Sequence, residues 1–286
     1  MKNIGVFDSG VGGLWILKYL REKLPEYNYI FLGDQAHVPY GSRSQEEIQK
    51  FSEEITKFLI SKDCQLIVVA CNTASGASLK SLREKFPQIK FVGMEPAVKP
   101  AVETTETGKV GVLATPATFQ SELYNSVVER FSHGAELFKD TCPGLVEEIE
   151  KGNLNSEKVK DILKNALSPM IKNGIDTVVL GCTHYPFVIP TIKEIVGEKV
   201  KVIDPTPAIA RQVGKILDEM ELEGIEQGEL ELADELAEDE TKKGTTEIYT
   251  SGVKEEMELL LPEFLGEGIN VKKIDWDNDL KVIMLK

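Results

Sequence analysis

The chain has 286 residues, of which 42% are apolar and 28% are charged, enough to build two hydrophobic cores of ordinary size. The first residues, MKNIGVFDSG, lack the apolar stretch of a secretory signal, and no segment reaches membrane-spanning length, so we predict a cytoplasmic protein with reduced thiols. The formal net charge of −14 opposes nucleic-acid binding, and we predict neither a nucleic acid nor a membrane as a partner.

Strands and helices alternate along the chain. Residues 2–13 read as a strand and a tight Gly-rich turn, and a helix is expected from Leu14 to about Lys23. Further strands are predicted at 27–34, 66–72 and 89–95, with helices at 44–64 and 78–85. The pattern then starts again, with strands at 108–115, 176–182 and 200–204 and helical segments at 117–131 and 143–172. Such alternation predicts an α/β fold with mainly parallel sheets flanked by helices.

The second set of elements repeats the first. Residues 4–9, 67–73 and 92–96 match residues 110–115, 178–184 and 201–205 in the same order, at offsets of 106, 111 and 109. An internal duplication predicts two pseudo-symmetric lobes. Lobe A comprises 1–98 and is completed by 207–286, and lobe B comprises 99–206. Because ligands bind beyond the C-terminal ends of parallel strands, we expect the active site at the lobe interface.

An acidic segment follows the second set. Residues 218–240 contain twelve acidic side chains and no basic one, so nearly all of the surplus negative charge lies here. The composition is typical of a solvated helix or a frayed insertion, and the alternative is a regulatory or partner-binding tail.

Two of the four cysteines follow repeated strands. Cys71 lies in VVACNTAS (68–75) and Cys182 in VVLGCTHYP (178–186). If the lobes face each other, both thiols point into one cleft from opposite sides. A disulfide between them conflicts with a reducing compartment, and a metal is not predicted, because no C-x-x-C pair occurs and His184 is the only histidine nearby.

The remaining cysteines and histidines are given structural interpretations. Cys64 is expected to be a small buried hydrophobe, and so is Cys142, although its loop could approach the cleft. His37 and His133 lack chemical neighbours and are expected to be structural or exposed. The turn DSGVGG (8–13) lacks the G-x-G-x-x-G spacing and a Walker lysine, so we do not predict a nucleotide site there.

Two opposed thiols suit the inversion of a stereocentre by proton transfer. One group removes a proton from one face of a carbon while the other delivers a proton to the opposite face. Polar neighbours that could tune the thiols lie at the same strand ends. These are Asp8, Asn72, Thr73, Thr183 and His184, with PYGS (39–42) on another loop.

At these residues the chain resembles the glutamate racemases, bacterial enzymes that interconvert L- and D-glutamate without pyridoxal phosphate. The matching motifs keep the family's order and spacing over about two thirds of the chain. They are GVFDSGVGG (5–13), VPYG (38–41), ACNTAS (70–75), EPAVKPA (95–101) and GCTHYP (181–186), and IDPTPAIA near 203 also fits.

The resemblance implies a cofactor-independent racemase that supplies D-glutamate for peptidoglycan synthesis and forms a homodimer. It implies that Cys71 handles the proton on the D face and Cys182 that on the L face, with assistance from Asp8, His184 and Glu150. The implied substrate contacts are Asp8, Ser9, Tyr40, Gly41, Asn72, Thr73, Thr183 and His184.

Some positions depart from the family pattern. Trp15 stands where a small polar residue is usual, and Ala117 replaces a usual glycine, which puts contacts from Thr115 and Thr118 in question. The acidic segment is longer than is typical. Two other functions stay open: a racemase for aspartate or another amino acid, and a two-lobed binding protein for an acidic amino acid with inert cysteines.

Overall fold

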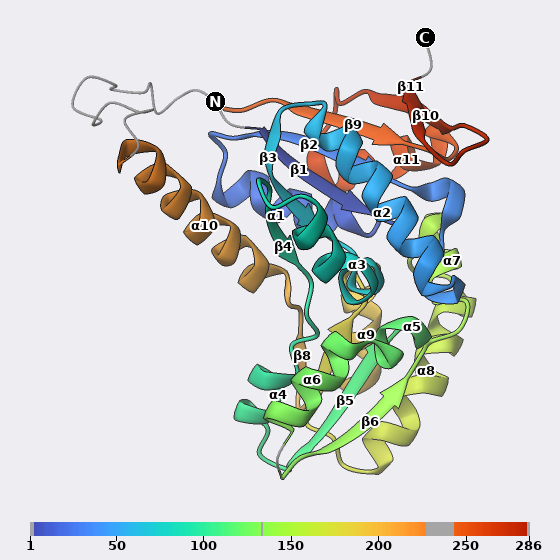
Figure 1. The fold of residues 1–286 in the computed structure, drawn as a ribbon. Coiled ribbons are helices and arrows are strands. Elements are labelled where there is room, and N and C mark those ends of the chain that lie inside the picture. The colour runs from blue at the N-terminus through green and yellow to red at the C-terminus, as the bar shows by residue number, and fades with distance from the viewer. Residues whose placement is uncertain (1–2, 133, 227–242, 285–286) are drawn as a thin grey trace.

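Two sheets organise the chain in the computed structural model, which describes residues 3–132, 134–226 and 243–284. A seven-stranded sheet has the order β11-β10-β9-β2-β1-β3-β4, and a four-stranded sheet has the order β6-β5-β7-β8. Figure 1 shows the two sheets one above the other, each with helices on its faces. The predicted α/β fold with two mainly parallel sheets is confirmed.

The first lobe is built from both ends of the chain. Its N-terminal elements are β1 (Asn3–Asp8), α1 (Gly13–Lys23), β2 (Asn28–Gly33), short 3-10 helices η1 (Gln35–His37) and η2 (Tyr40–Ser42), α2 (Gln45–Ile60), β3 (Cys64–Val69), α3 (Asn72–Lys85) and β4 (Lys90–Gly93). Its C-terminal elements are β9 (Thr246–Thr250), α11 (Lys254–Leu265), β10 (Val271–Trp276) and β11 (Val282–Met284). Among the strand pairs in the described residues, only β10 and β11 run antiparallel.

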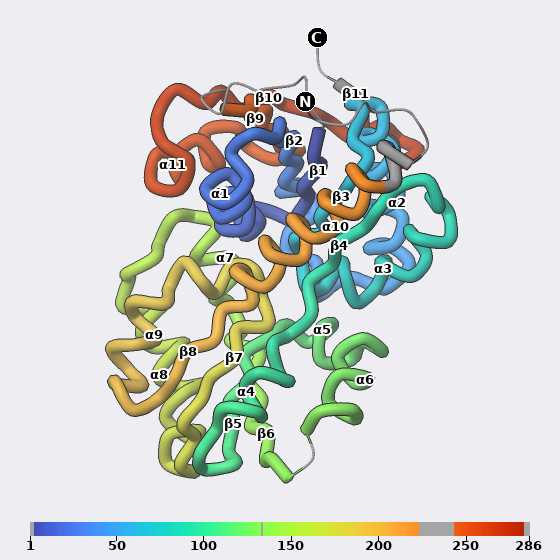
Figure 2. Tube along the Cα trace, turned by 90° about the vertical axis from the view of Figure 1, so that its left-hand side faces the viewer, coloured from blue at the N-terminus to red at the C-terminus, as the bar shows by residue number. Residues whose placement is uncertain are grey.

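The second lobe occupies the middle of the chain. Its elements are α4 (Val98–Thr104), β5 (Lys109–Ala114), α5 (Pro116–Gln120), α6 (Glu122–Phe131), β6 (Glu136–Asp140), α7 (Leu145–Glu150), α8 (Glu157–Lys172), β7 (Thr177–Gly181), the 3-10 helix η3 (Tyr185–Val188), α9 (Ile189–Val196) and β8 (Lys201–Ile203). The chain crosses between lobes after β4 and again into α10 (Thr206–Glu226), as Figure 2 shows. The lobe boundaries at 98/99 and 206/207 stay a prediction.

The strand order agrees with the duplication seen in the sequence. The order β2-β1-β3-β4 corresponds to β6-β5-β7-β8, and the repeated segments occupy equivalent strands. Phe7 pairs with Val69 near the end of β1 and β3, and Ala114 pairs with Gly181 at the end of β5 and β7. Cys71 and Cys182 therefore follow the same edge of two equivalent sheets.

One continuous apolar core runs through both lobes. It joins Leu14 and Leu17 of α1 to Leu180 of β7 and Ile192 of α9, all fully buried. Strands such as β1 and β7 are buried along almost their whole length, as expected for parallel strands covered by helices on both faces. The shared core holds the two sheet edges that carry the cysteines close to each other.

Several elements differ from the sequence-based expectation. The single helix predicted at 117–131 is two helices, because Ser121 adopts an extended backbone and its hydroxyl caps α6 by accepting a hydrogen bond from the Tyr124 N–H at 3.2 Å. The strand β6 and the three C-terminal strands were not predicted. Both corrections leave the α/β class unchanged.

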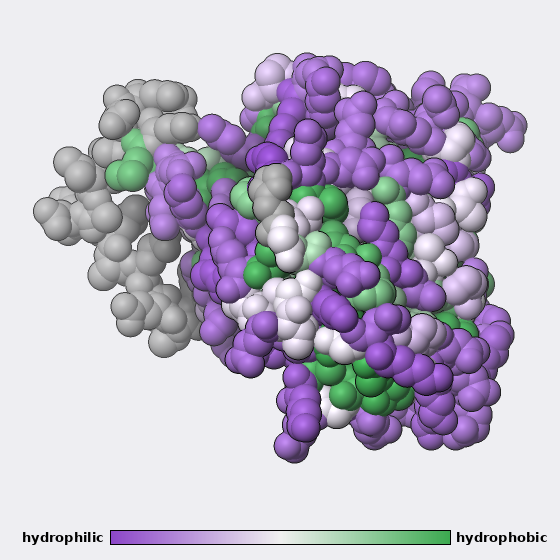
Figure 3. Space-filling view, turned by 90° about the horizontal axis from the view of Figure 1, so that it is seen from below, coloured by the Kyte–Doolittle hydropathy of each residue, from purple (hydrophilic) through white to green (hydrophobic). Residues whose placement is uncertain are grey.

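The acidic segment is helical as far as the structure describes it. Asp218, Glu219 and Glu221 lie on the exposed surface of α10, so this part is a solvated helix, and residues 227–242, like His133, lie outside the described residues. None of the helices in the described ranges combines the length and apolar character needed to cross a membrane. Seen from below, hydrophilic residues cover most of the surface and apolar residues form separate areas among them (Figure 3).

Candidate active site

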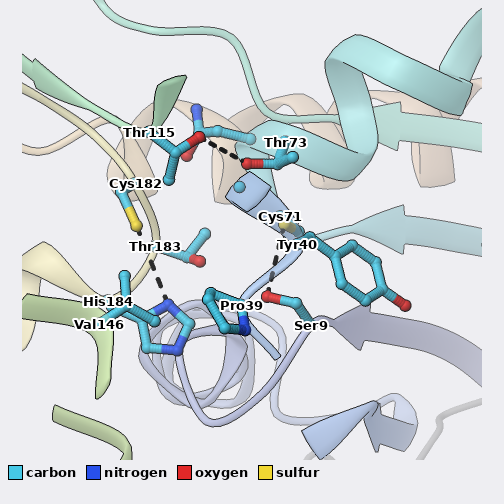
Figure 4. A pocket seen from close by; sticks show the side chains of 12 residues that line it. Ser9, Pro39, Tyr40, Cys71, Thr73, Thr115, Val146, Cys182, Thr183 and His184 are labelled. Atoms are coloured by element: carbon cyan, nitrogen blue, oxygen red, sulfur yellow. Dashed lines mark hydrogen bonds between the residues drawn. The ribbon is translucent and has the colours of Figure 1, made fainter. Parts of the chain in front are cut away.

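Loops that follow β1, β3 and β7 meet in one cavity between the lobes. The cavity is small. Polar side chains and apolar side chains that belong to both lobes line it (Figure 4). The lining consists of Ser9, Pro39, Tyr40, Gly41, Cys71, Asn72, Thr73, Thr115, Val146, Cys182, Thr183 and His184.

The two thiols lie on opposite sides of this cavity (Figure 4). Cys71 is 5% exposed and Cys182 is 6% exposed. Cys71 caps α3, where its Sγ accepts a hydrogen bond from the Ala74 N–H at 3.4 Å and lies 3.7 Å from the Ser9 hydroxyl. Burial, reinforced by the charge of Asp8, raises the pKa of the Cys71 thiol to about 12. Cys71 therefore carries its proton at neutral pH.

The other thiol has an imidazole beside it. Nδ1 of His184 lies 3.9 Å from Sγ of Cys182, and Nε2 of His184 lies 2.5 Å from Oε1 of Glu150. Burial lowers the pKa of His184, but the contacts with Cys182 and Glu150 and the charge of Asp8 outweigh it and hold the pKa well above its ordinary value. His184 therefore carries its proton next to Sγ of Cys182.

Glu150 is held by three donors from distant parts of the sequence. Besides His184, its carboxylate accepts hydrogen bonds from the Val11 N–H at 2.8 Å and from the Gln35 side-chain amide at 3.0 Å. Gln35 in turn accepts a hydrogen bond from the Thr250 hydroxyl at 2.6 Å. The chain of donors therefore fixes which carboxylate oxygen faces His184.

Asp8 lies next to the cavity lining and connects the two lobes through a hydrogen bond. Its side chain is fully buried and accepts hydrogen bonds from the Gly10 N–H and the Thr183 hydroxyl, both at 2.9 Å. Burial raises the pKa of Asp8 to about 6, although His184 and both hydrogen bonds lower it. Asp8 can therefore exchange a proton near neutral pH.

Close packing explains the Gly-rich turn after β1. A Cβ atom at Gly10 would overlap the Glu150 carboxylate, and a Cβ atom at Gly12 would lie 2.6 Å from Nδ1 of His184. Only glycine allows the backbone to approach these side chains so closely. The turn therefore packs directly against Glu150 and His184 of the other lobe.

The polar side chains on the α3 side of the cavity differ in how they are satisfied. Within the described residues, Oδ1 and Nδ2 of Asn72 are buried without any hydrogen-bond partner. Buried amides are almost always paired, so Asn72 is available to a ligand. Thr73 instead shares its hydroxyl with Thr115 at 2.8 Å and Thr118 at 3.3 Å, which connects the two lobes across the cavity.

The structure brings most of the predicted site residues together. All of the predicted substrate contacts line the cavity except Asp8. Asp8 instead accepts a hydrogen bond from Thr183, which does line the cavity. The Tyr40 hydroxyl points away from the cavity and donates to Asp34 at 2.7 Å, so only its backbone and ring face the site (Figure 4). Glu150 reaches the site through His184 rather than by lining it.

Sequence reasoning missed some contributors. Thr115, whose contact was placed in question, does line the cavity, and it is the repeat counterpart of Ser9, a signal that could have identified it. Gln35 and Val146 carried no such signal. Cys64 and Cys142 are buried outside the cavity lining, as expected for structural cysteines, and burial raises the pKa of both thiols.

The cysteines and acidic residues form neither a disulfide nor a metal cluster in the part of the chain that the structure describes. All four cysteines are free. Over the same described ranges, no three His, Cys, Asp or Glu side chains converge in a way that could hold a metal ion.

Known proteins resemble this chain over nearly its whole length. The family profile described as Asp/Glu/Hydantoin racemase matches residues 16–213. A glutamate racemase from Pseudomonas aeruginosa (strain UCBPP-PA14) is 41% identical over 95% of this chain and 97% of its own length. Another from Clostridium perfringens (strain SM101) is 44% identical over 82% of this chain and 90% of its own length.

Solved structures of similar proteins have the same fold. A glutamate racemase isoform from Bacillus anthracis superposes with a TM-score of 0.80 at 33% identity, covering 98% of this chain and 99% of that chain. The Escherichia coli glutamate racemase, solved with L-glutamate and the activator UDP-MurNAc-Ala, gives a TM-score of 0.78 at 31% identity, covering 100% and 99%.

Proposed function

The chain belongs to the Asp/Glu/Hydantoin racemase family, and on that premise we propose that it is a glutamate racemase that interconverts L-glutamate and D-glutamate. The observation that carries this proposal is the pair of buried thiols on opposite sides of one small cavity (Figure 4). Support for the substrate comes from relatives named glutamate racemase and from a similar structure solved with L-glutamate.

In the L-to-D direction the thiolate of Cys182 removes the Cα proton and the thiol of Cys71 delivers a proton to the opposite face. One C–H bond breaks and one forms, so the carbon is inverted and one proton has moved between the thiols. Protonated His184 stabilises the thiolate of Cys182, and the high pKa of Cys71 keeps that thiol ready as the acid. The reverse direction exchanges the two roles.

The polar groups around the thiols bind the amino acid. Asn72 has both amide atoms free for a ligand, and Ser9 and Thr183 present hydroxyls to the cavity. Glu150 holds His184 in place, because its carboxylate is bound by Val11 and Gln35 as well. Asp8 assists from its position near Cys71 and Thr183.

Chiral chromatography tests the reaction. Purified protein incubated with L-glutamate should yield D-glutamate without added pyridoxal phosphate or metal, and L-aspartate should stay unconverted. Racemisation of aspartate instead would identify the related amino-acid racemase. In deuterated water, binding without exchange at Cα would identify a binding protein with inert cysteines. Activity that required bound pyridoxal phosphate would contradict the two-thiol mechanism.

The biological setting completes the proposal. The protein acts in the cytoplasm as a homodimer and supplies D-glutamate for peptidoglycan synthesis. Two exposed apolar side chains, Val253 (54% exposed) and Leu259 of α11 (68% exposed), are candidates for the subunit contact. Light scattering after gel filtration should give twice the chain mass, and Leu259→Glu should shift the population toward monomers. A protein that stayed monomeric at all concentrations would contradict the proposed homodimer.

A further inference from the structure

Trp15 lies outside the cavity but connects α1 to the loops of the other lobe. Its indole Nε1 donates a hydrogen bond to Oδ2 of Asp204 at 2.8 Å. Asp204 follows β8, and its other oxygen accepts the Thr206 N–H at 2.9 Å at the start of α10. One side chain of the first lobe therefore anchors the end of a strand in the second.

The same indole belongs to an aromatic cluster formed by Trp15, Phe187 and Phe264. The ring centroid of Trp15 lies 6.0 Å from that of Phe187 and 5.9 Å from that of Phe264, and the two phenylalanine rings are 4.4 Å apart. Phe187 belongs to η3 in the second lobe, whereas Phe264 belongs to α11 in the first. Phe187 is therefore held against two helices of the opposite lobe.

Phe187 is part of the turn that carries Cys182 and His184. Its N–H donates to the His184 carbonyl at 3.1 Å, and the Tyr185 N–H donates to the Cys182 carbonyl at 3.1 Å. Gly12, at the start of α1, already contacts His184 at the other end of this turn. The helix α1 therefore supports the turn at two points, through Gly12 at its start and through Trp15 in its first turn.

We propose that Trp15 is a positioning residue for Cys182 and His184, and that it acts through Phe187. The proposal rests on the proposed racemase function. Loss of the indole should disturb the Cys182 side of the cavity and leave the Cys71 side intact.

The test separates the two sides with an amino-acid substrate that carries chloride on its β-carbon. A thiolate removes the Cα proton, the C–Cl bond breaks, a C=C bond forms and chloride leaves, so a single base suffices. Elimination from the L-enantiomer uses Cys182, and elimination from the D-enantiomer uses Cys71. Trp15→Ser should slow the L-reaction about tenfold and change the D-reaction less than about twofold, since small misplacements of catalytic groups are costly.

Two further variants control the experiment. Trp15→Phe keeps an aromatic ring but loses the bond to Asp204, and it should restore most of the L-reaction. Tyr19→Leu alters another aromatic neighbour of Trp15, whose ring centroid lies 6.1 Å away on the same helix, and should leave both reactions within about twofold of the parent. Melting temperatures, measured in parallel, report any loss of folded protein.

The outcomes are distinct. Equal slowing of both enantiomers by Trp15→Ser, or no slowing of either, would overturn the positioning role while the parent still racemises glutamate. If the parent protein does not racemise glutamate at all, the proposed function itself has failed.

Discussion

The two thiols follow equivalent strands of a duplicated scaffold, but their surroundings differ. Cys71 lies beside a hydroxyl, Ser9, and its pKa is raised to about 12 by burial and by the charge of Asp8. Cys182 lies beside His184, whose pKa is well above its ordinary value because its contacts outweigh the effect of burial. One thiol therefore has a neutral hydroxyl beside it, and the other has a protonated imidazole beside it.

The repeat shows how this difference arises. In the alignment of the two halves, Thr73 corresponds to His184 and Ala114 corresponds to Asp8. The first half therefore has an ionisable group, Asp8, where the second half has alanine. The second half has an ionisable group, His184, where the first half has threonine. The duplication supplies symmetric positions for the two thiols, and substitutions around them give each thiol different polar neighbours.

The largest effect is expected from removing either thiol. Cys71→Ala and Cys182→Ala should each reduce racemisation about ten-thousandfold or more, because every turnover needs both a base and an acid. The partial reactions should show mirror-image selectivity, with Cys71→Ala eliminating chloride only from the L-analogue and Cys182→Ala only from the D-analogue. Similar rates with both enantiomers in both variants, or near-parental racemisation by either, would rule out the two-thiol assignment.

The next prediction concerns Asp8, which is present on one side only. Its pKa is 3.8 ordinarily and about 6 in the folded protein, so the folded state binds a proton more tightly than the unfolded chain. This difference in pKa stabilises the folded protein by roughly 3 kcal/mol when the pH is below the ordinary pKa of Asp8. The stabilisation is lost as the pH rises through about 6. Asp8→Asn should remove this dependence.

Urea unfolding between pH 4 and pH 7.5 measures the effect. The free energy of unfolding of Asp8→Asn, relative to that of the parent, should increase as the pH rises through about 6. Asp8→Asn should also racemise glutamate more slowly than the parent. Glu129→Gln, at an exposed position of α6, is the matched control and should give a curve parallel to that of the parent. Parallel curves for Asp8→Asn as well would show that burial does not raise the pKa of Asp8.

A smaller effect is expected at Gln35, on the Cys182 side. Gln35→Met keeps most of the side-chain volume but removes the amide that donates to Glu150 at 3.0 Å. The carboxylate would then hold His184 less firmly, so elimination from the L-analogue should slow about fivefold to tenfold, with little change for the D-analogue.

Thr250→Val provides the control for this step. It removes the hydroxyl that donates to Gln35 at 2.6 Å but leaves the amide that faces Glu150, so its effect should be smaller than that of Gln35→Met. If Gln35→Met slowed the D-reaction as much as the L-reaction, Gln35 would act on the fold and not on one side of the cavity.

Local patterns were sufficient to predict β1 to β5, β7 and β8. Buried runs such as those of β1 and β7 mark parallel strands, and the repeat placed Cys71 and Cys182 at equivalent strand ends. By contrast, β6 is partly exposed and rich in charged residues, so its sequence ELFKD carries no strand signal of that kind. Strands that are buried on both faces are the ones a sequence reveals.

Side-chain direction could not be predicted, because it depends on partners that are distant in the chain. The Tyr40 hydroxyl turns to Asp34, which also accepts hydrogen bonds from Ser251 at 2.6 Å and from Trp276 at 2.9 Å. Gln35 likewise reaches Glu150, 115 residues away. Neither pairing has a local signature, so a motif identifies the loop but not which of its atoms face the cavity.

The smallest effect is expected from the acidic segment, which belongs to neither side of the cavity. The described part of this segment is solvated, with Leu222 at 62% exposure on α10, and none of the described residues after His184 lines the cavity. Replacing residues 224–243 with a short Gly/Ser bridge should therefore leave racemisation in both directions within about threefold of the parent. A deletion variant with unchanged secondary structure by circular dichroism that had lost all activity would show that the segment shapes the site or an essential subunit contact. A loss of activity toward only one enantiomer would show that the acidic segment influences one of the two thiols. The segment would then be a further source of difference between the Cys71 and Cys182 sides of the cavity.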